Sequence, residues 1–271
     1  MILFDFEGYE NVGQYLLNRR TIKRLFRDKG YPVISISSPV GSSLRALTDL
    51  NEILSRHSVN EGLLDVSTLP RKYIFGICRM LTDLSFPTTI RYYRPALYGH
   101  ELSRGVGNVE AIPGFEGDMN SMGETVLGLV LGFEGYKALH AWERIGPSKL
   151  LAFIGDPPYR PEFLVFARDC NKEVMTAAGN VTELPLHTHD PYVAKAQLQF
   201  AYDQLKSEGT RQSFVLCPLG TKLQSLAAFA FALSNPAVSV AHVSSLSYFT
   251  GDYSRGHEEP LDFVLSDLVA A

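Results

Sequence analysis

Cysteine is scarce in this sequence, and no two cysteines form a CxxC pair. Cys78, Cys170 and Cys217 are far apart in the chain, and each lies in or beside an apolar run. We therefore expect buried, reduced thiols rather than disulfides. This use of cysteine is typical of a cytoplasmic protein.

Long hydrophobic runs are also lacking. No apolar stretch approaches the roughly 18 residues that a membrane-spanning helix needs. The first ten residues, MILFDFEGYE, carry three acidic side chains where a signal peptide carries positive charge. Together these absences predict a soluble intracellular protein that has no contact with a membrane.

Excess positive charge is absent as well, because 25 Lys and Arg stand against 29 Asp and Glu. A protein that coats nucleic acid by electrostatics needs a surplus of cations, so bulk nucleic-acid binding is not expected, although a local basic pocket is compatible with this charge. No nucleophile motif, Walker loop or GxGxxG sequence supports ATPase or dehydrogenase chemistry. We predict no cofactor.

What the sequence does have is an alternation of strand-like and helix-like segments. In the first half the predicted strands are residues 1–6, 31–38, 62–67 and 88–95, and the predicted helices are residues 11–30, 41–58 and 69–84. After a Gly-rich connection, the predicted strands are residues 124–132, 149–155, 181–186, 213–218 and 238–245, and the predicted helices are residues 136–146, 161–175, 191–209 and 220–235. This alternation predicts an α/β fold with mainly parallel sheets.

The two halves share short sequences in the same order. FEGY occurs twice, beginning at Phe6 and at Phe133. Residues 62–105 and 213–256 align without a gap, strand on strand and helix on helix, and both segments end in SRG. The FEGY copies lie 127 residues apart and the SRG copies 151 residues apart, so the second half carries 24 extra residues.

We interpret the chain as two tandem Rossmann-like units packed as a pseudo-dimer. The first unit spans residues 1–112, the second spans residues 123–271 and contains an insertion, and residues 106–122 form the linker. The alternative is one large α/β domain in which the short matches are coincidental.

The FEGY loops are the first candidate for chemistry, because ligands of parallel sheets bind where the strands end. Glu7 and Glu134 could accept hydrogen bonds from a base or ribose, or act as general acid or base. Tyr9 and Tyr136 could stack on a ring. The alternative is a carboxylate that caps a helix.

A second candidate lies between the predicted strand at 213–218 and the helix that follows it. Gly220, Thr221 and Lys222 combine a helix N-terminus, a hydroxyl and an ammonium group, all of which favour a phosphate. The matched residues of the first half are Ser67, Thr68 and Arg71. An ordinary threonine N-cap is the alternative.

Arginines after the last strand of each half are the third candidate. Arg104 and Arg255 stand in the SRG segments, which we predict to be turns, and Arg94 lies on the same edge. Arginine suits two-pronged phosphate recognition, whereas a solvated surface arginine is the alternative.

Other polar clusters give weaker evidence of a functional site. The HTHD sequence at residues 187–190 has ligand types that suit a metal, but no second cluster supports one, so we predict a surface loop in which Asp190 caps the next helix and no metal site. Asp156 follows a strand and could shape the cleft or take part in catalysis. The basic run at residues 18–29 predicts a solvated helix face.

The strand-GTK-helix at residues 215–223 resembles the GTK motif of CARF domains, the Rossmann-like sensors of cyclic oligonucleotides in prokaryotic defence. SAVED domains look like two such units fused in one chain. The resemblance implies that Gly220, Thr221 and Lys222 contact a ligand phosphate. Leu219 replaces a glycine that is frequent in CARF domains, Leu69, Pro70 and Arg71 depart from GTK, and no effector domain is recognisable.

Three functions follow as hypotheses. The first is binding of a phosphorylated nucleotide-type ligand in a composite cleft between the two units, as a sensor or subunit of a defence system. The second is hydrolysis of a nucleotide or nucleoside by Glu7 or Glu134. The third is a structural role beside a protein partner or effector.

Overall fold

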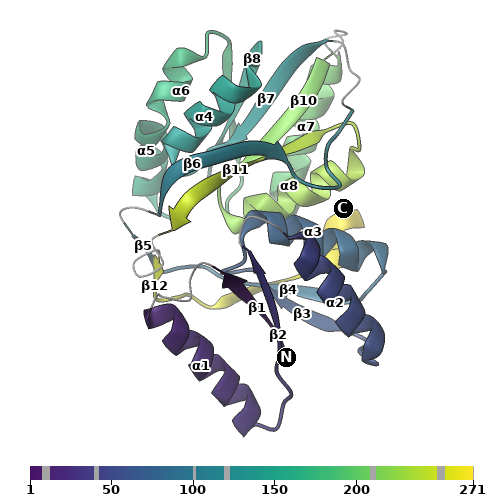
Figure 1. Cartoon of the computed structure of the whole chain (residues 1–271). Helices are drawn as coiled ribbons and strands as arrows, with labels where there is room; N and C mark the ends of the chain where they lie inside the picture. Colours follow the sequence, from purple (N-terminus) through teal and green to yellow (C-terminus); the bar gives the residue numbers. More distant parts are fainter. Residues whose placement is uncertain are drawn as a thin grey trace.

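The computed structural model describes residues 1–7, 13–39, 43–99, 102–118, 123–207, 212–248 and 254–270. The fold is α/β, as the alternation predicted, with helices packed on mixed sheets and a main sheet that is largely parallel (Figure 1). No described helix is long and apolar enough to cross a membrane.

The first half supplies the lower part of Figure 1 and one strand of the upper part. Its strands are β1 (Ile2–Glu7), β2 (Ile34–Pro39), β3 (Gly62–Asp65), β4 (Thr88–Tyr93), β5 (Leu97–Tyr98) and β6 (Ser103–Ala111). Its helices are α1 (Gly13–Asp28), α2 (Leu44–Arg56) and α3 (Arg71–Asp83).

The second half builds most of the upper part. Its strands are β7 (Glu124–Val130), β8 (Lys149–Gly155), β9 (Val181–Leu186), β10 (Gln212–Pro218), β11 (Ser239–Tyr248), β12 (Ser254–Arg255) and β13 (Pro260–Val264). Its helices are α4 (Gly135–Ile145), α5 (Pro161–Cys170), α6 (Lys172–Ala177), α7 (Pro191–Ser207), α8 (Lys222–Ser234) and α9 (Leu265–Ala270).

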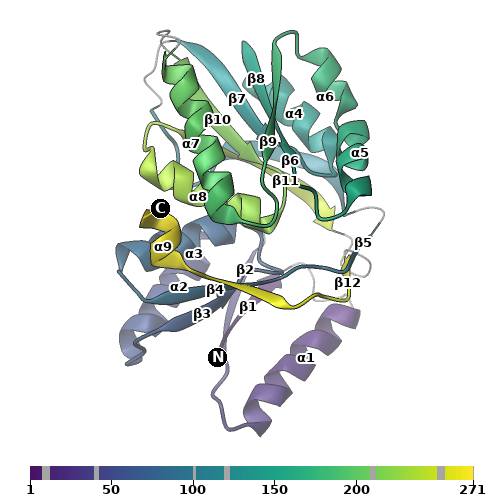
Figure 2. The ribbon, with the colours of Figure 1, turned by 180° about the vertical axis from the view of Figure 1, so that it is seen from behind.

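The main sheet has the strand order β6-β11-β10-β7-β8-β9, and β6 is its antiparallel member. Leu127 and Leu129 of β7 face the core beside α4 and α6, whereas Val126 and Val130 face the core beside α7 and α8. The two views agree that α4, α5 and α6 lie on one side of this sheet and α7 and α8 on the other (Figures 1 and 2). Both faces are therefore covered, which explains the continuous apolar runs of its inner strands.

The two halves exchange one strand each. β6 comes from the first half but pairs with β11 of the second, and β13 comes from the second half but pairs with β4 of the first. Between them, β5 pairs with β12. Helix α3 of the first half packs against α8 of the second, where Phe75 and Phe229 meet at a ring-centroid distance of 5.9 Å. The core beside α7 and α8 therefore runs through both halves.

Two sequence predictions are wrong in this region. The Gly-rich connection does not begin as a linker, because residues up to Ala111 belong to β6 and pair with β11. The SRG segments are not turns after the last strand, because Ser103 and Arg104 open β6 and Ser254 and Arg255 form β12. Glycine obscured β6, which contains Gly105 and Gly107, because glycine contributes no apolar side chain to a periodic pattern.

The prediction of buried, reduced cysteines is confirmed for two of the three. All three are free thiols, Cys78 and Cys217 are buried and Cys170 is half-buried. Burial raises the pKa of Cys78 and of Cys217 to about 12. The helix predicted at 161–175 is instead two helices, α5 and α6, that meet at Asn171, whose side chain donates to the carbonyl of Ala167.

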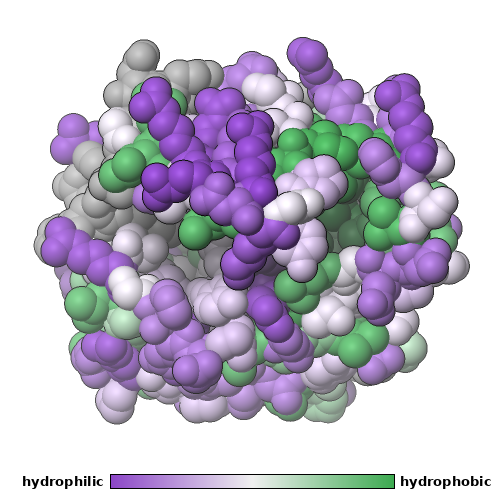
Figure 3. All heavy atoms as spheres, turned by 90° about the horizontal axis from the view of Figure 1, so that it is seen from below, coloured by the Kyte–Doolittle hydropathy of each residue, from purple (hydrophilic) through white to green (hydrophobic). Residues whose placement is uncertain are grey.

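Helix α1 carries the solvated basic face that the sequence predicted. Arg20, Arg24 and Arg27 are exposed, while Arg19 forms an ion pair with Asp5. Figure 3 looks onto the end of the molecule at which α1 lies, and hydrophilic side chains gather over much of this face beside separate apolar patches.

Candidate functional site

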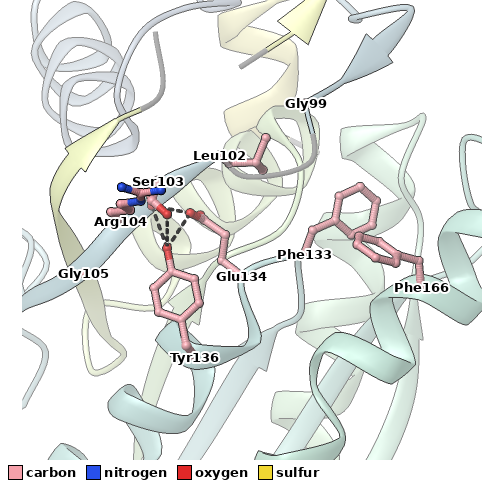
Figure 4. A pocket seen from close by; sticks show the side chains of 9 residues that line it. All are labelled: Gly99, Leu102, Ser103, Arg104, Gly105, Phe133, Glu134, Tyr136 and Phe166. Atoms are coloured by element: carbon pink, nitrogen blue, oxygen red, sulfur yellow. Dashed lines mark hydrogen bonds between the residues drawn. The ribbon is translucent and has the colours of Figure 1, made fainter. Parts of the chain in front are cut away.

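A pocket of about 310 Å³ opens where the two halves meet, beyond the carboxyl end of β7. It is lined by both halves (Figure 4). The lining residues are Gly99, Leu102, Ser103, Arg104 and Gly105 from the first half and Phe133, Glu134, Tyr136 and Phe166 from the second. The second FEGY segment and the first SRG segment therefore line the same pocket.

The FEGY segment reaches the pocket because it makes the turn from β7 into α4. Glu134 is the N-cap residue of α4, and its side chain makes no cap hydrogen bond. A Cβ atom on Gly135 would lie 1.7 Å from the carbonyl oxygen of Cys170, so only glycine fits there. This close packing turns the Glu134 and Tyr136 side chains toward β6 (Figure 4).

Glu134 is the centre of a polar network. The hydroxyl of Ser103 donates to Glu134 Oε1, and the hydroxyl of Tyr136 lies 3.0 Å from the same oxygen and 2.8 Å from Ser103 Oγ. Lys137 Nζ donates to Glu134 Oε2 at 2.7 Å. The hydroxyl of Ser245 on β11 donates to Ser103 Oγ at 3.0 Å. Both carboxylate oxygens are therefore held by side chains of β6 and α4, and β11 contributes only through Ser103.

The charge of Glu134 is stabilised by these partners. Burial acts to raise its pKa, but the charge of Lys137 and the hydrogen bonds from Lys137 and Ser103 outweigh burial, so the pKa of Glu134 lies below the usual value of a glutamate. The carboxylate is consequently ionised at neutral pH. It can accept hydrogen bonds from a ligand, but it is a weak general acid.

The opposite wall is aromatic. The ring of Phe133 lies 5.1 Å from that of Phe166 and 5.2 Å from that of Phe163, measured between centroids. Tyr98 extends the cluster, with its ring 5.9 Å from Phe133. Edge-on contacts of this kind hold the rings in place. A flat ligand ring would therefore meet a rigid apolar surface.

Arg104 supplies the cation of the pocket. It is exposed on β6 and is followed by Gly105, whose φ of +66° is a left-handed conformation that favours glycine. A Cβ atom on Gly105 would also lie 2.7 Å from the side chain of Leu246. The glycine thus fixes the local path of the strand at the point where the arginine faces the pocket.

Arg71 and Lys222 meet at the contact between α3 and α8. Arg71 Nη2 donates to the carbonyl oxygens of Leu219, at 2.8 Å, and Gly220, at 2.5 Å. In return, Lys222 Nζ donates to the carbonyl oxygen of Leu69. Arg71 matches Lys222 in the aligned segments, and Leu69 matches Gly220, so the two contacts are reciprocal.

These cations stand in a positive region of the interior. Burial and then the repulsion of Arg71 lower the pKa of Lys222 to about 7. Burial is also the main reason why the pKa of His242, on β11, falls to about 3. The cations that lower the pKa of His242 further are Lys72, Arg71, Lys137 and Lys222. The imidazole of His242 is therefore neutral at physiological pH.

The GTK segment caps the N-terminus of α8. Thr221 accepts a hydrogen bond from the backbone of Gln224, and the Gln224 side chain accepts from the backbone of Thr221, which is a complete capping box. A Cβ atom on Gly220 would lie 2.2 Å from Gln224 Oε1. The alternative of a threonine N-cap is confirmed, and Gly220 makes room for the cap.

The remaining predicted residues that the structure describes lie outside the pocket. Glu7 ends β1, is exposed and accepts a hydrogen bond from Ser37 at 3.4 Å. Ser67 donates to Asp65 and accepts from the backbone of Tyr93. The other three are Thr68, which is exposed, Arg255, which is exposed on β12, and Tyr9, which lies outside the described residues.

The HTHD loop has the predicted structural role. Asp190 accepts hydrogen bonds from the backbone of Tyr192 and Val193 at the start of α7, so the predicted cap is confirmed. His189 contacts Arg94, with 3.0 Å between His189 Nδ1 and Arg94 Nη1. In the part of the chain that the structure describes, no group of three or more His, Cys, Asp or Glu could hold a metal ion.

Sequence reasoning missed several residues that build the pocket or its surroundings. They are Ser103, Lys137, Phe133, Phe166 and His242. Ser103 and Phe133 belong to the SRG and FEGY segments, so the repeat itself could have identified them. No such signal marks Lys137, Phe166 or His242. An aromatic or basic residue on a helix or strand usually has only a packing role.

A scan against models of known protein families finds no match, and no curated protein matches the sequence. The resemblance to CARF and SAVED domains therefore rests on the residues quoted above.

Proposed function

We propose that the protein binds a phosphorylated nucleotide-type ligand in the pocket between the two halves. The single observation that carries this proposal is the composition of that pocket, in which Arg104, the Glu134 network and an aromatic wall line one cavity of about 310 Å³. That volume is at the lower end of the range of small-molecule sites. It suits one nucleotide unit, and a larger ligand would extend out of the open side.

Each wall of the pocket would contact a different part of the ligand. The aromatic wall of Phe133 and Phe166 stacks on the base. The ionised Glu134 accepts hydrogen bonds from base or ribose groups, and Arg104 pairs with a phosphate in two-pronged fashion. Because Lys222 and Arg71 already donate to backbone carbonyls, they do not line the pocket, and the charge of Arg71 helps to lower the pKa of Glu134.

The proposal includes the tandem duplication. In the first half the order β13-β4-β3 places an antiparallel strand beside two parallel ones, and the order β6-β11-β10 does the same in the second. Helices α3 and α8 begin and end at matched positions of the aligned segments. Gly105 and Gly256 match as well, and both have a left-handed φ, at +66° and +61°. The reciprocal Arg71 and Lys222 contacts support this part of the proposal, because an interface with two-fold symmetry repeats each contact.

The ancestor in this proposal is a homodimeric Rossmann-like protein whose subunits exchanged their last strands. A sensor or subunit role in prokaryotic defence, acting with a separate effector, is the part of the proposal that rests on the resemblance to CARF and SAVED domains. A hydrolase has weaker support, since a glutamate with a lowered pKa is poorly suited to act as general acid.

Thermal-shift and calorimetric titration with linear and cyclic nucleotides test the proposal. A ligand at about 100 times its Kd should stabilise the fold by about 2.7 kcal/mol. Arg104→Ala should weaken binding of that ligand by about tenfold or more, because it removes the phosphate contact. Arg56→Ala, an exposed arginine on α2 paired with Glu52, is the matched control and should leave affinity unchanged.

Two results would contradict the proposal. One is the lack of stabilisation by any phosphorylated ligand, and the other is an affinity that Arg104→Ala leaves untouched. Phosphorus NMR of the same mixtures detects turnover, and a hydrolysis rate abolished by Glu134→Gln would favour the hydrolase instead.

A further inference from the structure

Arg94 and His189 connect the two halves outside the pocket lining. Arg94 lies in the short connection between β4 and β5, and both views place β5 at the junction of the upper and lower parts (Figures 1 and 2). His189 lies in the loop between β9 and α7. Arg94 Nη1 is 3.0 Å from His189 Nδ1, and the contact is partly buried.

The partners of His189 fix the position of its ring proton. A guanidinium only donates hydrogen bonds, so Nδ1 accepts from Arg94 and carries no proton. Nε2 lies 3.3 Å from the carbonyl oxygen of Pro158, which only accepts, so Nε2 carries the proton. The contacts therefore require a neutral imidazole. A second proton, on Nδ1, would remove the bond from Arg94 and leave two cations 3.0 Å apart.

Arg94 is also held on its other sides. Its Nη2 atom pairs with Glu258, in the connection between β12 and β13. Its guanidinium carbon lies 4.7 Å from the ring centre of Tyr159, in the loop between β8 and α5. The Tyr159 ring in turn packs edge-on against His189, with centroids 4.7 Å apart. We call Arg94, Glu258, Tyr159 and His189 the Arg94 clasp.

The other groups around His189 do not compensate a positive charge on it. The ring of His187 is 6.0 Å away, and its Nδ1 accepts from the backbone N–H of Asp190. The Asp190 carboxylate is occupied by backbone N–H groups at the start of α7. Burial, together with the charges of Arg94 and His187, lowers the pKa of His189 below the usual value of a histidine, although the Pro158 carbonyl acts in the opposite direction.

The remaining titratable groups of the clasp have settled charges. Burial raises the pKa of Tyr159, so its phenol is neutral. Glu258 is the acidic side chain of the clasp, and it is already paired with Arg94. Protonation of His189 would therefore add a positive charge to a cluster whose single acidic group is in use.

We propose that His189 is the proton switch of the Arg94 clasp. While the imidazole is neutral, it holds Arg94 between the two halves. When acid protonates Nδ1, Arg94 loses this bond and is repelled, so the contact of the halves on this side opens. The inference does not depend on the nucleotide proposal, because no residue of the clasp lines the pocket.

NMR titration of the full chain tests the switch, with the His189 signal assigned by its loss in His189→Gln. We expect a pKa for His189 below about 6.5 in the wild-type chain. Arg94→Met should raise this pKa by about half a unit or more, because it removes both the donor and the repelling charge. A His189 that does not titrate while the chain stays folded, or a pKa that Arg94→Met leaves unchanged, would overturn the proposal.

Urea denaturation at pH 7.5 and at one unit below the measured pKa of His189 tests the clasp itself. At pH 7.5, Arg94→Met should increase the unfolding equilibrium constant about tenfold or more. At the lower pH the increase should be at least about threefold smaller, which corresponds to the half-unit change in pKa. In a His189→Gln background the effect should be equal at both pH values, because a glutamine amide accepts from Arg94 and donates to Pro158 without titrating.

Arg91→Met is the matched control on the same strand end. Arg91 pairs with Asp262, whose pKa it holds below the usual value of an aspartate, so its effect on unfolding should be the same at both pH values. An Arg94→Met effect that is independent of pH in the wild-type background, or equally dependent on pH in the His189→Gln background, would overturn the proposal.

The wild-type chain and His189→Gln alone provide a test that does not require Arg94→Met to fold. Below pH 6.5 the unfolded chain binds a proton on His189 that the folded chain does not, until the pH reaches the pKa of the folded state. The unfolding constant of the wild-type chain should therefore rise relative to that of His189→Gln as the pH falls, by up to about tenfold per pH unit. A parallel pH dependence of the two chains would overturn the proposal.

Discussion

At the scale of single residues, identical sequence does not mean identical surroundings. Glu134 is held by Ser103, Tyr136 and Lys137 at the junction of the halves. Glu7, in the same FEGY sequence, ends a strand on the surface and contacts Ser37. The hydrogen-bonding capacity of the two carboxylates is the same, but Glu134 has three side-chain partners and lines the pocket, whereas Glu7 is exposed. A functional role therefore belongs to Glu134 in our proposal.

Lys222 leads to a prediction about pH. The pKa of its ammonium falls from about 10.4 in an unfolded chain to about 7 in the fold. Between these values the unfolded chain binds a proton that the folded protein does not, so this group makes the folded state more stable as pH rises, by at most about 1.4 kcal/mol per pH unit. Below pH 7 both states are charged and the full cost of burying the charge applies.

Lys222→Met should therefore raise the free energy of unfolding relative to the wild-type chain at pH 6, and this gain should shrink steadily toward pH 9. Urea denaturation at pH 6, 7.5 and 9 measures it. Lys172→Met provides the control, since Lys172 is exposed and its variant should differ from wild type by the same amount at each pH. A difference for Lys222→Met that is constant with pH would contradict the prediction.

At the scale of elements, α3 and α8 match in position but differ in how they begin. α8 starts with the capping box of Thr221 and Gln224. α3 starts after Pro70, which makes no side-chain cap bond. The GTK sequence that suggested a phosphate site therefore has a clear local function, which is to satisfy backbone donors at the start of a helix whose residues from Leu223 to Ala232 are buried.

Thr221→Ala should consequently lower the free energy of unfolding by about 1 kcal/mol, with a range of about 0.5–2 kcal/mol. Ser43→Ala is a matched control because Ser43 is the N-cap residue of α2 but makes no side-chain cap hydrogen bond. Its effect should be clearly smaller. Chemical denaturation measures the free energy of unfolding of both variants. An equal decrease in the two would show that the Thr221 hydroxyl does not stabilise α8.

At the scale of the whole molecule, the exchange of β6 and β13 makes the halves depend on each other. Residues 1–122 made alone would carry β6 without β11, and β4 would lack β13. The shared core on α3 and α8 would be exposed as well. Neither half should then unfold cooperatively by itself.

We expect residues 1–122 and 123–271, produced separately, to show no cooperative thermal transition, and co-expression of the two pieces to restore one. Calorimetry measures both cases, with the intact chain as reference. A sharp transition in residues 1–122 alone, near the melting temperature of the whole chain, would mean that the first half is an independent domain.

The sequence by itself determined the α/β class, most strands and helices, the burial of Cys78 and Cys217 and the cap at Asp190. These features depend on periodicity, composition and neighbours within a few residues, which a sequence displays directly. The tertiary structure alone decided that β6 and β13 change partners between the halves, and that Ser103, Glu134 and Arg104 share a pocket. Strand pairing and burial join residues that are far apart in the chain, and the free energy of such contacts depends on which surfaces meet, which no local pattern encodes.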